Sequence, residues 1–307
     1  MKFLVLDVGG SFIKFAIIDE NGKFYKKGKT PTVHRHDKDQ FLDILENIYK
    51  ENKEEGLSGI ALSVPGAVDV EKGIVYKGGG VPCLDKVCVI EELSKRCDGI
   101  KVAVENDGKS AGLAEVWLGH AKDVQDAIVM VFGSGIGGAI IKDRKIHRGN
   151  RLVAGEISNL IVDYTRQDLL DGKPLIMNLW ALKASAVALS IRVGKMKGKD
   201  FKECPGEKIY EWAAAGDEQC IEAIEDMYYS IAMQAYNFQY TYDPDIILLG
   251  GGISEQPSFL TGVQKYVDLL SQHEHQFAKP VIKACKFNND SNLLGALYNF
   301  MQLYHII

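Results

Sequence analysis

Short runs of apolar, often β-branched residues separated by glycine are the first pattern along the chain. Residues 2–8 and 12–18 form two such runs around Gly9 and Gly10, which predicts two strands joined by a glycine turn. Pro65-Gly66 ends a third run, and a triple glycine follows a later one. The same reasoning predicts further strands at 60–64, 101–104, 127–132, 138–142, 246–249 and 281–284.

Apolar residues spaced three to four apart predict helices between these strands. The clearest case is the closing segment 291–304, where Leu293, Leu294, Leu297, Phe300 and Met301 fall on one face. Similar spacing predicts helices at 41–48, 90–96, 111–117 and about 217–240. Strands and helices that alternate in this way are typical of an α/β architecture.

One internal similarity links distant parts of the chain. Residues 7–19 and 131–143 share a layout of strand, glycine turn and strand. The repeat predicts two equivalent lobes. The alternative is that two β-hairpins with glycine-rich turns resemble each other by chance.

Length and charge narrow the class of protein. The 307 residues correspond to about two domains at roughly 150 residues each. With 46% hydrophobic residues and a net charge of −5, the chain is a folded protein for which nucleic acid is not an expected partner. The first apolar run, 3–6, is too short for a signal peptide or a membrane span. We therefore expect a cytoplasmic protein with no membrane partner.

The cysteines give no sign of a metal centre. The six of them are spread over about two hundred residues, and no two stand at C-x-x-C or another metal-ligand spacing. We expect reduced thiols, with neither a zinc site nor a disulfide framework. They are Cys83, Cys88, Cys97, Cys204, Cys220 and Cys285.

Two familiar nucleotide motifs are excluded by their context. The segment 133–138 contains a formal G-x-G-x-x-G, but residues 139–141 continue as a strand, whereas a dinucleotide fold needs a helix there. Gly108-Lys109-Ser110 resembles the end of a Walker A loop, but Ala103 stands at the position of the required glycine. What remains are two glycine turns whose backbone N–H groups can reach phosphate oxygens. One turn in each lobe would bind one nucleotide.

Two groups of polar residues at predicted strand ends are candidates for chemistry. Asp7 precedes the first glycine turn, where its carboxylate could hold Mg2+ directly or through water, with Lys14 directed at the same anions. The alternative for Asp7 is a simple turn residue. Glu105-Asn106-Asp107 follows a strand and precedes a helix, a good position for a catalytic base. The alternative for Asp107 is the N-cap of that helix.

A third candidate is the turn Ala154-Gly155-Glu156, which follows the basic stretch 145–151. The Glu156 carboxylate can accept hydrogen bonds from a pair of sugar hydroxyls. The alternative is a glutamate in a surface loop.

Taken together, these motifs resemble the ROK family of bacterial sugar kinases (repressor, open reading frame, kinase), within the actin-like ATPase superfamily. Residues 7–14 resemble its first phosphate motif, 105–107 its catalytic motif and 133–138 its second phosphate motif. Ala154-Gly155-Glu156 resembles its sugar-binding turn, and 249–253 its nucleoside-binding loop. The resemblance covers the chain nearly end to end.

The resemblance implies two actin-like (ribonuclease H-like) lobes with the active site in a cleft, Mg2+ and ATP as cofactors, and Asp107 as general base. The N-terminal lobe is expected at 1–117, joined by the closing helix in 291–307, and the larger C-terminal lobe at 118–290. Sugar-binding residues would be Gly66, Asn106, Glu156 and Asn159. ATP-binding residues would be Asp7, Gly9, Gly10, Ser11, Lys14, Gly133, Ser134, Gly135, Gly137, Gly138, Gly251 and Gly252.

Two departures from the family pattern bear on the substrate. Asn159 replaces a sugar-binding histidine and no cysteine cluster follows it, so no zinc is expected. Ala181 stands where the family supplies a second sugar-binding glutamate. Both changes open space near one end of the sugar ring. They suit a bulkier or different substituent there. Family members without zinc include kinases of glucose, β-glucosides and N-acetylmannosamine, and we expect glucose or a β-glucoside slightly ahead of N-acetylmannosamine.

The family resemblance also leaves two functions other than a kinase. A DNA-binding regulator would carry a helix-turn-helix before the first phosphate motif, but that motif begins six residues into the chain. A sugar-sensing or binding protein without catalysis would not need Asp7, Asp107 and two phosphate turns. The family resemblance also implies a homodimer.

Overall fold

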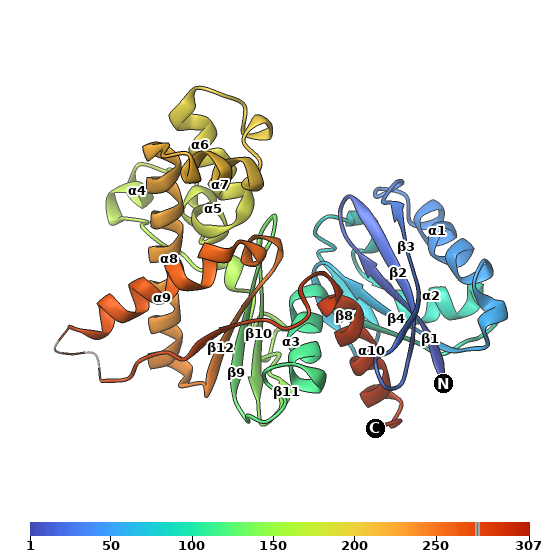
Figure 1. The fold of residues 1–307 in the computed structure, drawn as a ribbon. Helices are drawn as coiled ribbons and strands as arrows, with labels where there is room; N and C mark the ends of the chain where they lie inside the picture. The colour runs from blue at the N-terminus through green and yellow to red at the C-terminus, as the bar shows by residue number, and fades with distance from the viewer. Residues whose placement is uncertain (274, 276) are drawn as a thin grey trace. The chain divides into compact units, whose positions relative to one another are not determined.

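The computed structural model describes residues 1–273, 275 and 277–307, which form two compact α/β units (Figure 1). Unit 1 comprises Met1–Lys122, Arg148–Val153 and Asp290–Ile307, and unit 2 comprises Asp123–His147 and Ala154–Asn289. Unit 1 therefore extends past the expected boundary at residue 117. It also includes the short segment Arg148–Val153, which we expected in the second lobe.

Unit 1 is built on a five-stranded sheet in the order β3-β2-β1-β4-β8. The first three strands pair antiparallel, and β1, β4 and β8 run parallel. A smaller antiparallel sheet, β5-β6-β7, is formed by residues that lie between β4 and β8 along the chain. The strands are β1 (Lys2–Val8), β2 (Phe12–Asp19), β3 (Phe24–Pro31), β4 (Leu57–Val64), β5 (Ala67–Asp69), β6 (Ile74–Tyr76), β7 (Val87–Cys88) and β8 (Val102–Asn106).

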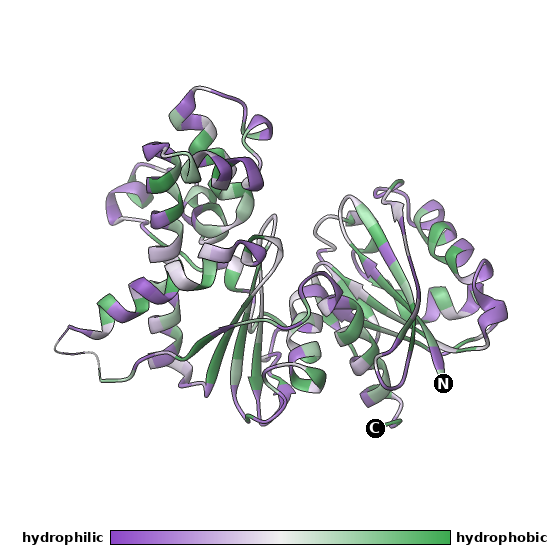
Figure 2. Cartoon of the chain, viewed as in Figure 1, coloured by the Kyte–Doolittle hydropathy of each residue, from purple (hydrophilic) through white to green (hydrophobic). Residues whose placement is uncertain are grey.

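Helices cover both faces of this sheet. Leu4 and Leu6 of β1 belong to a core shared with α1 (Lys38–Lys50) and α2 (Val89–Arg96). Phe3 of β1 packs against Phe300 of α10 (Ser291–Leu303) on the other face, which α10 shares with α3 (Asp107–Leu118). Figure 2 shows the strands as mainly hydrophobic, as expected for a sheet covered on both faces.

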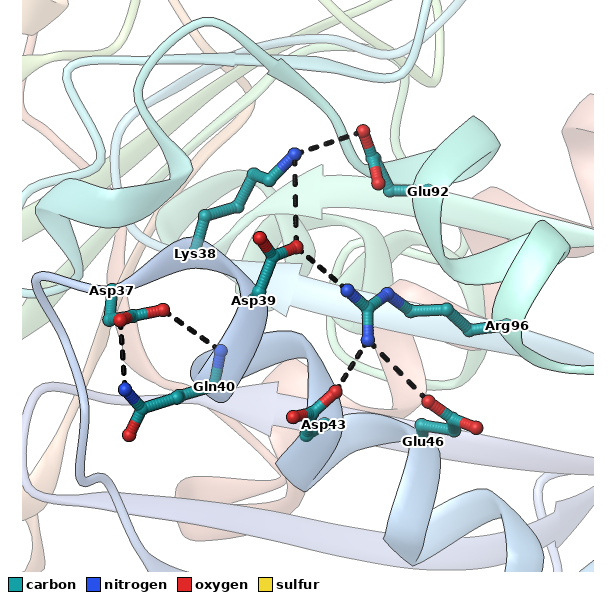
Figure 3. Close-up of polar contacts among 8 residues, drawn as sticks. All are labelled: Asp37, Lys38, Asp39, Gln40, Asp43, Glu46, Glu92 and Arg96. Atoms are coloured by element: carbon teal, nitrogen blue, oxygen red, sulfur yellow. Dashed lines mark hydrogen bonds and ion pairs between the residues drawn. The ribbon is translucent and has the colours of Figure 1, made fainter.

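A charged network links α1 to α2 on the surface of unit 1 (Figure 3). The Arg96 guanidinium contacts Asp39 at 2.8 Å, Asp43 at 2.5 Å and Glu46 at 3.5 Å. Lys38 of α1 reaches Glu92 of α2 at 3.2 Å. Because Asp39 and Asp43 are solvent-exposed, their ion pairs with Arg96 orient the two helices more than they stabilise them.

Unit 2 repeats the plan of unit 1. Its sheet has the order β11-β10-β9-β12-β13, with the first three strands antiparallel and β9, β12 and β13 parallel. The hairpin β9–β10 therefore takes the same place as β1–β2. This topology confirms the prediction of two equivalent lobes. The strands are β9 (Ala127–Phe132), β10 (Ile136–Lys142), β11 (Lys145–Ile146), β12 (Ile246–Gly250) and β13 (Ile282–Ala284).

Helices of unit 2 pack against one face of its sheet. Phe132 of β9 touches Trp180 and Phe259 in a core that also includes Met227 and Tyr228. The helices are α4 (Arg166–Leu170), α5 (Ala181–Ala184), α6 (Ala186–Lys197), α7 (Gly206–Ala214), α8 (Glu218–Tyr242) and α9 (Pro257–Ser271). Single 3-10 turns lie at Lys53–Glu55, Pro82–Leu84, Ile157–Asn159, Leu175–Asn178, Phe201–Glu203, Gly252–Glu255 and Asn288–Asp290.

The cysteines and the length of the apolar helices bear on the class of protein. None of the six cysteines forms a disulfide, and four of them are buried. Within residues 1–273, 275 and 277–307, no helix is long and apolar enough to span a membrane.

Candidate active site

The first glycine turn joins β1 to β2 in unit 1. The Gly9 N–H donates to the Phe12 carbonyl at 3.0 Å, which closes the turn. Thr32 Oγ1 donates to the Gly9 carbonyl at 2.7 Å, and Arg35 Nη1 donates to the Gly10 carbonyl at 3.3 Å. Ser11 is exposed beyond them. Thr32 and Arg35 thus anchor the carbonyl groups of this turn. The Arg35 guanidinium, which no sequence motif indicated, lies next to it.

Asp7 lies beside this turn and is only 8% exposed. Its Oδ1 accepts a hydrogen bond from Asn292 Nδ2 at 3.0 Å, and Lys14 Nζ lies 3.8 Å from its Oδ2. Burial raises the pKa of the Asp7 carboxyl above its ordinary value, although the Asn292 hydrogen bond and the Lys14 charge oppose this effect. A nearly buried carboxylate with a long, weak cation contact fits a position that receives a second cation.

The predicted catalytic motif lies where β8 gives way to α3. Asn106 Nδ2 donates to the Gly66 carbonyl at 2.9 Å and to Asp107 Oδ1 at 3.0 Å. Asp107 Oδ1 also accepts from the Gly108 N–H at 2.7 Å. Asp107 is half-buried at the first turn of the helix, where the helix dipole favours a carboxylate. The structure therefore brings three predicted residues, Gly66, Asn106 and Asp107, into direct contact.

The N-cap of α3 is Asn106, and the alternative interpretation of Asp107 as that cap is wrong. Asn106 Oδ1 accepts from the Lys109 N–H at 3.0 Å, whereas Asp107 is already the first helical residue. The strand also extends two residues further than predicted, so Glu105 and Asn106 belong to β8. Asp107 therefore does not cap α3, and its carboxylate lies at the first turn of this helix.

Gly66 has a backbone that only glycine adopts easily at this position. Its φ is +99°, and a Cβ there would lie 2.6 Å from the Lys77 carbonyl oxygen and 2.8 Å from that of Tyr76. A side chain at residue 66 would therefore displace the carbonyl that Asn106 uses.

The second glycine turn joins β9 to β10 in unit 2. The Gly133 N–H donates to the Gly135 carbonyl at 3.0 Å, and the Gly133 carbonyl accepts from the Ala186 N–H at the start of α6. A Cβ at Gly133 would meet no atom within 4 Å, so the surface of the turn is open. Gly137 and Gly138, in contrast, lie inside β10.

Gly138 makes room for the predicted sugar-binding turn. A Cβ at Gly138 would lie 2.5 Å from the Gly155 carbonyl oxygen, and Gly155 itself has a φ of +84°. Ser158 Oγ accepts from the Ile136 N–H at 3.0 Å and donates to the Ile136 carbonyl at 2.7 Å. The turn that carries Glu156, which is half-buried, is thereby fixed to the strand that follows the second glycine turn.

A pocket of about 290 Å³ in unit 2 connects two of the predicted motifs. Gly133 and Ser134 of the second glycine turn line it together with Gly252 of the expected nucleoside loop. Gly251 has a φ of +92°, and a Cβ there would lie 2.3 Å from the Phe132 carbonyl oxygen, so the loop lies directly on β9. The other lining residues are Phe132, Ala186, Gly206, Glu207, Tyr210, Ile253 and Gln256.

Tyr210 gives this pocket a fixed hydroxyl. Its hydroxyl is 3.0 Å from that of Tyr228, which in turn is 3.1 Å from Ser258 Oγ. Burial raises the pKa of Tyr210, so the hydroxyl stays protonated at neutral pH. The pocket thus combines glycine backbone, an aromatic wall and a few polar groups, as small-molecule sites commonly do.

The two departures from the family pattern lie close to each other. Ile161 pairs antiparallel with Leu179, and the Trp180 N–H donates to the Leu160 carbonyl at 2.8 Å. Following this register places Asn159, which is exposed, at the same end as Ala181. A region that would hold a histidine and a glutamate therefore holds one amide and one methyl group.

The remaining feature of the site is its set of possible metal ligands. Among the residues described, no group of three or more His, Cys, Asp or Glu side chains could hold a metal ion. Asp7 is therefore a single carboxylate, of the kind that binds Mg2+ together with substrate phosphates and water.

Several site residues had no clear signal in the sequence. Asn292 contacts Asp7 across a separation of 285 residues, and no local pattern marks it. Ser158 follows Glu156 by two residues, and its position in a polar turn is the one sequence feature that could have indicated its role. The others are Thr32, Arg35, Ala186, Gly206, Glu207, Tyr210 and Gln256.

Comparison with known proteins agrees with this geometry. The chain belongs to the ROK family, whose family model matches residues 3–302. It is 30% identical to the β-glucoside kinase of Listeria innocua over 304 residues, which is 98% of each chain. Other relatives are also named as sugar kinases, among them an N-acetyl-D-glucosamine kinase of Histophilus somni, which is 28% identical over 96% of this chain and 97% of that one.

Solved structures share the same fold. A ROK family protein of Streptococcus pneumoniae, solved in complex with sucrose, has a TM-score of 0.87 and 34% identity, and the match covers 100% of both chains. A ROK family glucokinase of Streptomyces griseus, solved with glucose and AMPPNP, has a TM-score of 0.81 and 20% identity, with 96% of this chain and 98% of that chain covered. The actin-like two-lobe fold expected from the sequence is thus confirmed.

Proposed function

We propose that the protein is an ATP-dependent kinase of a hexose or a hexose derivative. The observation that carries the proposal is the Asp107 carboxylate, which is half-buried at the start of α3 and held by the Asn106 side chain next to Gly66. Its relatives in the ROK family include named β-glucoside kinases. A fixed carboxylate at that position suits a base that activates a sugar hydroxyl.

The chemistry assigned to Asp107 is proton removal. As the hydroxyl oxygen of the sugar forms its bond to the γ-phosphorus, its proton passes to the Asp107 carboxylate, and the bond from the γ-phosphorus to the bridging oxygen breaks to release ADP. Asn106 and Gly108 each donate a hydrogen bond to Asp107 Oδ1, and these two bonds fix the orientation of the carboxylate. Fixing the carboxylate before the reaction lowers the entropy cost of reaching the transition state.

Nucleotide binding is assigned to the two glycine turns and the pocket of unit 2. The N–H groups of Gly9 and Gly133 close the two turns. The backbone N–H groups of Gly10 and Gly135 would bind phosphate oxygens, and Ser11, Ser134 and Lys14 would add polar contacts. The nucleoside would occupy the pocket between Gly133 and Gly252. Asp7 would hold Mg2+, directly or through water, and bound Mg2+ neutralises charge on the phosphates.

Sugar binding is assigned to Gly66 and Asn106 in unit 1 and to Glu156 and Asn159 in unit 2. Asn159 and Ala181 leave space and remove the hydrogen-bond partners that a histidine and a glutamate would supply, which suits a bulkier or different substituent at that end of the ring. Among such sugars we place glucose or a β-glucoside slightly ahead of N-acetylmannosamine. The name of the Listeria innocua relative favours the same order.

The proposal is tested by identifying the product. The protein is incubated with Mg-ATP and one sugar at a time: glucose, cellobiose and other β-glucosides, mannose, fructose, N-acetylglucosamine and N-acetylmannosamine. Phosphorus NMR then detects a sugar phosphate ester. Formation of an ester from glucose or a β-glucoside supports the proposal. Sugar binding in calorimetry with no ester from any sugar would instead favour a non-catalytic sugar sensor.

We also propose that the chain acts as a homodimer. Support comes from exposed apolar side chains grouped in one stretch of unit 2, which a second copy would cover. Sedimentation equilibrium measures the mass directly, and a monomer at all concentrations would contradict this part of the proposal. The residues are Ile161, Leu169, Leu170, Leu175, Ile176 and Met177.

A further inference from the structure

A fully buried carboxylate stands immediately before the catalytic pair. Glu105, the penultimate residue of β8, is 0% exposed. Its Oε1 accepts from Arg148 Nη1 at 2.9 Å and from the Asn106 N–H at 2.7 Å, and its Oε2 accepts from Arg148 Nη2. The arginine thus contacts both carboxylate oxygens, the geometry in which a guanidinium fixes a carboxylate most firmly.

Arg148 reaches Glu105 through an unusual path of the chain. It opens the segment Arg148–Val153, which belongs to unit 1, while the residues before it and after it belong to unit 2. Leu152 in this segment has a φ of +61°, a conformation that leucine rarely adopts. Backbone of this kind persists only where the surrounding structure holds it in place, and it is frequent near functional sites.

A continuous set of hydrogen bonds leads from Arg148 to Asp107. Arg148 fixes Glu105, and Glu105 fixes the Asn106 backbone N–H. The Asn106 side chain then donates to Asp107 Oδ1 and to the Gly66 carbonyl. Because Glu105 and Asn106 are adjacent, a tilt of Glu105 turns the Asn106 backbone and with it the amide that holds Asp107.

We propose that Arg148 is a positioning residue for phosphoryl transfer. Its two-point ion pair with Glu105 fixes the end of β8, and through Asn106 it fixes the carboxylate that takes the proton of the sugar hydroxyl. The inference rests on the proposed role of Asp107 as general base. The basic stretch 145–151 thereby gains a function, although neither nucleotide binding nor sugar contact requires it.

Two arginine variants separate charge from geometry. Arg148→Met removes both, and Arg148→Lys keeps the charge but loses the two-point contact. We expect kcat to fall by ~10-fold to ~100-fold in Arg148→Met, the size of effect that a misplaced catalytic group produces. KM for ATP stays unchanged, KM for the sugar changes less than kcat because Asn106 is also assigned to the sugar, and Arg148→Lys recovers only part of kcat. The matched control is Arg151→Met, an exposed arginine of the same segment, with unchanged kcat.

A double variant separates positioning from folding. Arg148→Met leaves Glu105 as a buried, unpaired charge, which lowers Tm, whereas Glu105→Gln/Arg148→Met removes that charge and recovers Tm. All rates are measured well below the Tm of each variant. Because the two-point contact is still missing, we expect kcat of the double variant to stay low although its Tm recovers. Recovery of kcat together with Tm would show a purely structural role and would overturn the inference.

Asp107→Asn, measured in parallel, separates this inference from the proposed function. If Asp107→Asn is inactive while Arg148→Met has the kcat of the unmodified protein, only the positioning role fails. A rise in sugar KM with unchanged kcat in Arg148→Met would also overturn it, because that pattern indicates a substrate contact. If Asp107→Asn keeps full kcat, the assignment of the base itself fails.

Discussion

Asn292, in the first turn of the closing helix α10, donates a hydrogen bond to Oδ1 of Asp7 at the end of the first strand. The two residues lie near opposite ends of the chain and meet in unit 1. Asp7 keeps this partner and a distant Lys14, yet its pKa remains raised because burial removes water from the carboxylate. The protein therefore retains a charge that costs folding free energy, as expected for a residue kept for function.

Asp7→Asn is expected to stabilise the protein and to impair the use of Mg-ATP. The folded-state pKa is raised above the ordinary value of 3.8, so the cost of the charge is absent below that value, grows as pH rises, and is complete above the raised pKa. Tm of the variant should exceed that of the unmodified protein at pH 8, and the gap should narrow as pH falls toward 4. KM for Mg-ATP should rise by about 10-fold or more.

Thermal unfolding at a series of pH values checks the first part, and initial rates at varied Mg-ATP check the second. A variant that is less stable at pH 8, or that uses Mg-ATP as well as the unmodified protein does, contradicts the role given to Asp7.

Gly138→Ala should loosen the turn to which we assign sugar binding. The new Cβ would lie 2.5 Å from the Gly155 carbonyl oxygen, so the turn must move away from β10. The expected loss is about 1–3 kcal/mol of unfolding free energy, with a larger rise in KM for the sugar than for ATP. Urea denaturation and steady-state kinetics measure the two effects. Gly133→Ala, where no atom lies within 4 Å, should show no loss of stability.

Ala186→Phe should fill the pocket assigned to the nucleoside. Ala186 is half-buried at the start of α6 and lines the pocket of about 290 Å³. We expect KM for ATP to rise by about 10-fold or more, corresponding to roughly 1.4 kcal/mol, while calorimetric sugar affinity is unchanged. Ile191→Phe, on the exposed side of the same helix, is the matched control. Equal ATP kinetics in both variants would place the nucleoside elsewhere.

Removal of divalent metal should stop catalysis without unfolding the protein. No cluster of three or more potential ligands was found among the residues described, so we expect no structural metal. EDTA should abolish turnover, and Mg2+ alone should restore it, with Tm unchanged throughout. A lower Tm in EDTA, or recovery that requires zinc, would reveal a metal site that this interpretation lacks.

The sequence predicted the two hairpins well because their cores are local. The runs 2–8 and 127–132 match β1 and β9, since short, nearly continuous apolar runs mark strands that are buried on both faces of a sheet. The edge strand β3 (Phe24–Pro31) was missed because most of its side chains are exposed and four are polar or charged. Short helices such as α7 (Gly206–Ala214) gave no sustained periodicity.

The candidate site was predictable where its residues form contiguous motifs. Gly66, Asn106 and Asp107 meet as expected, because the ends of neighbouring parallel strands lie together. Asn292 was not predictable, because its contact with Asp7 depends on how a helix nearly three hundred residues away packs on the sheet. The same holds for Arg148, whose partner Glu105 is 43 residues distant.

The proposed general base is tested most directly by a comparison of Asp107→Asn with the unmodified protein in a coupled assay of ADP release, using Mg-ATP and the sugar that gives the highest rate. We expect kcat of the variant to fall by ~10²-fold or more, because a positioned base is lost. Calorimetric affinities for the sugar and the nucleotide should stay nearly the same, since the amide retains the Asn106 and Gly108 contacts. An Asp107→Asn protein with unchanged kcat would contradict the assignment of Asp107 and the mechanism built on it.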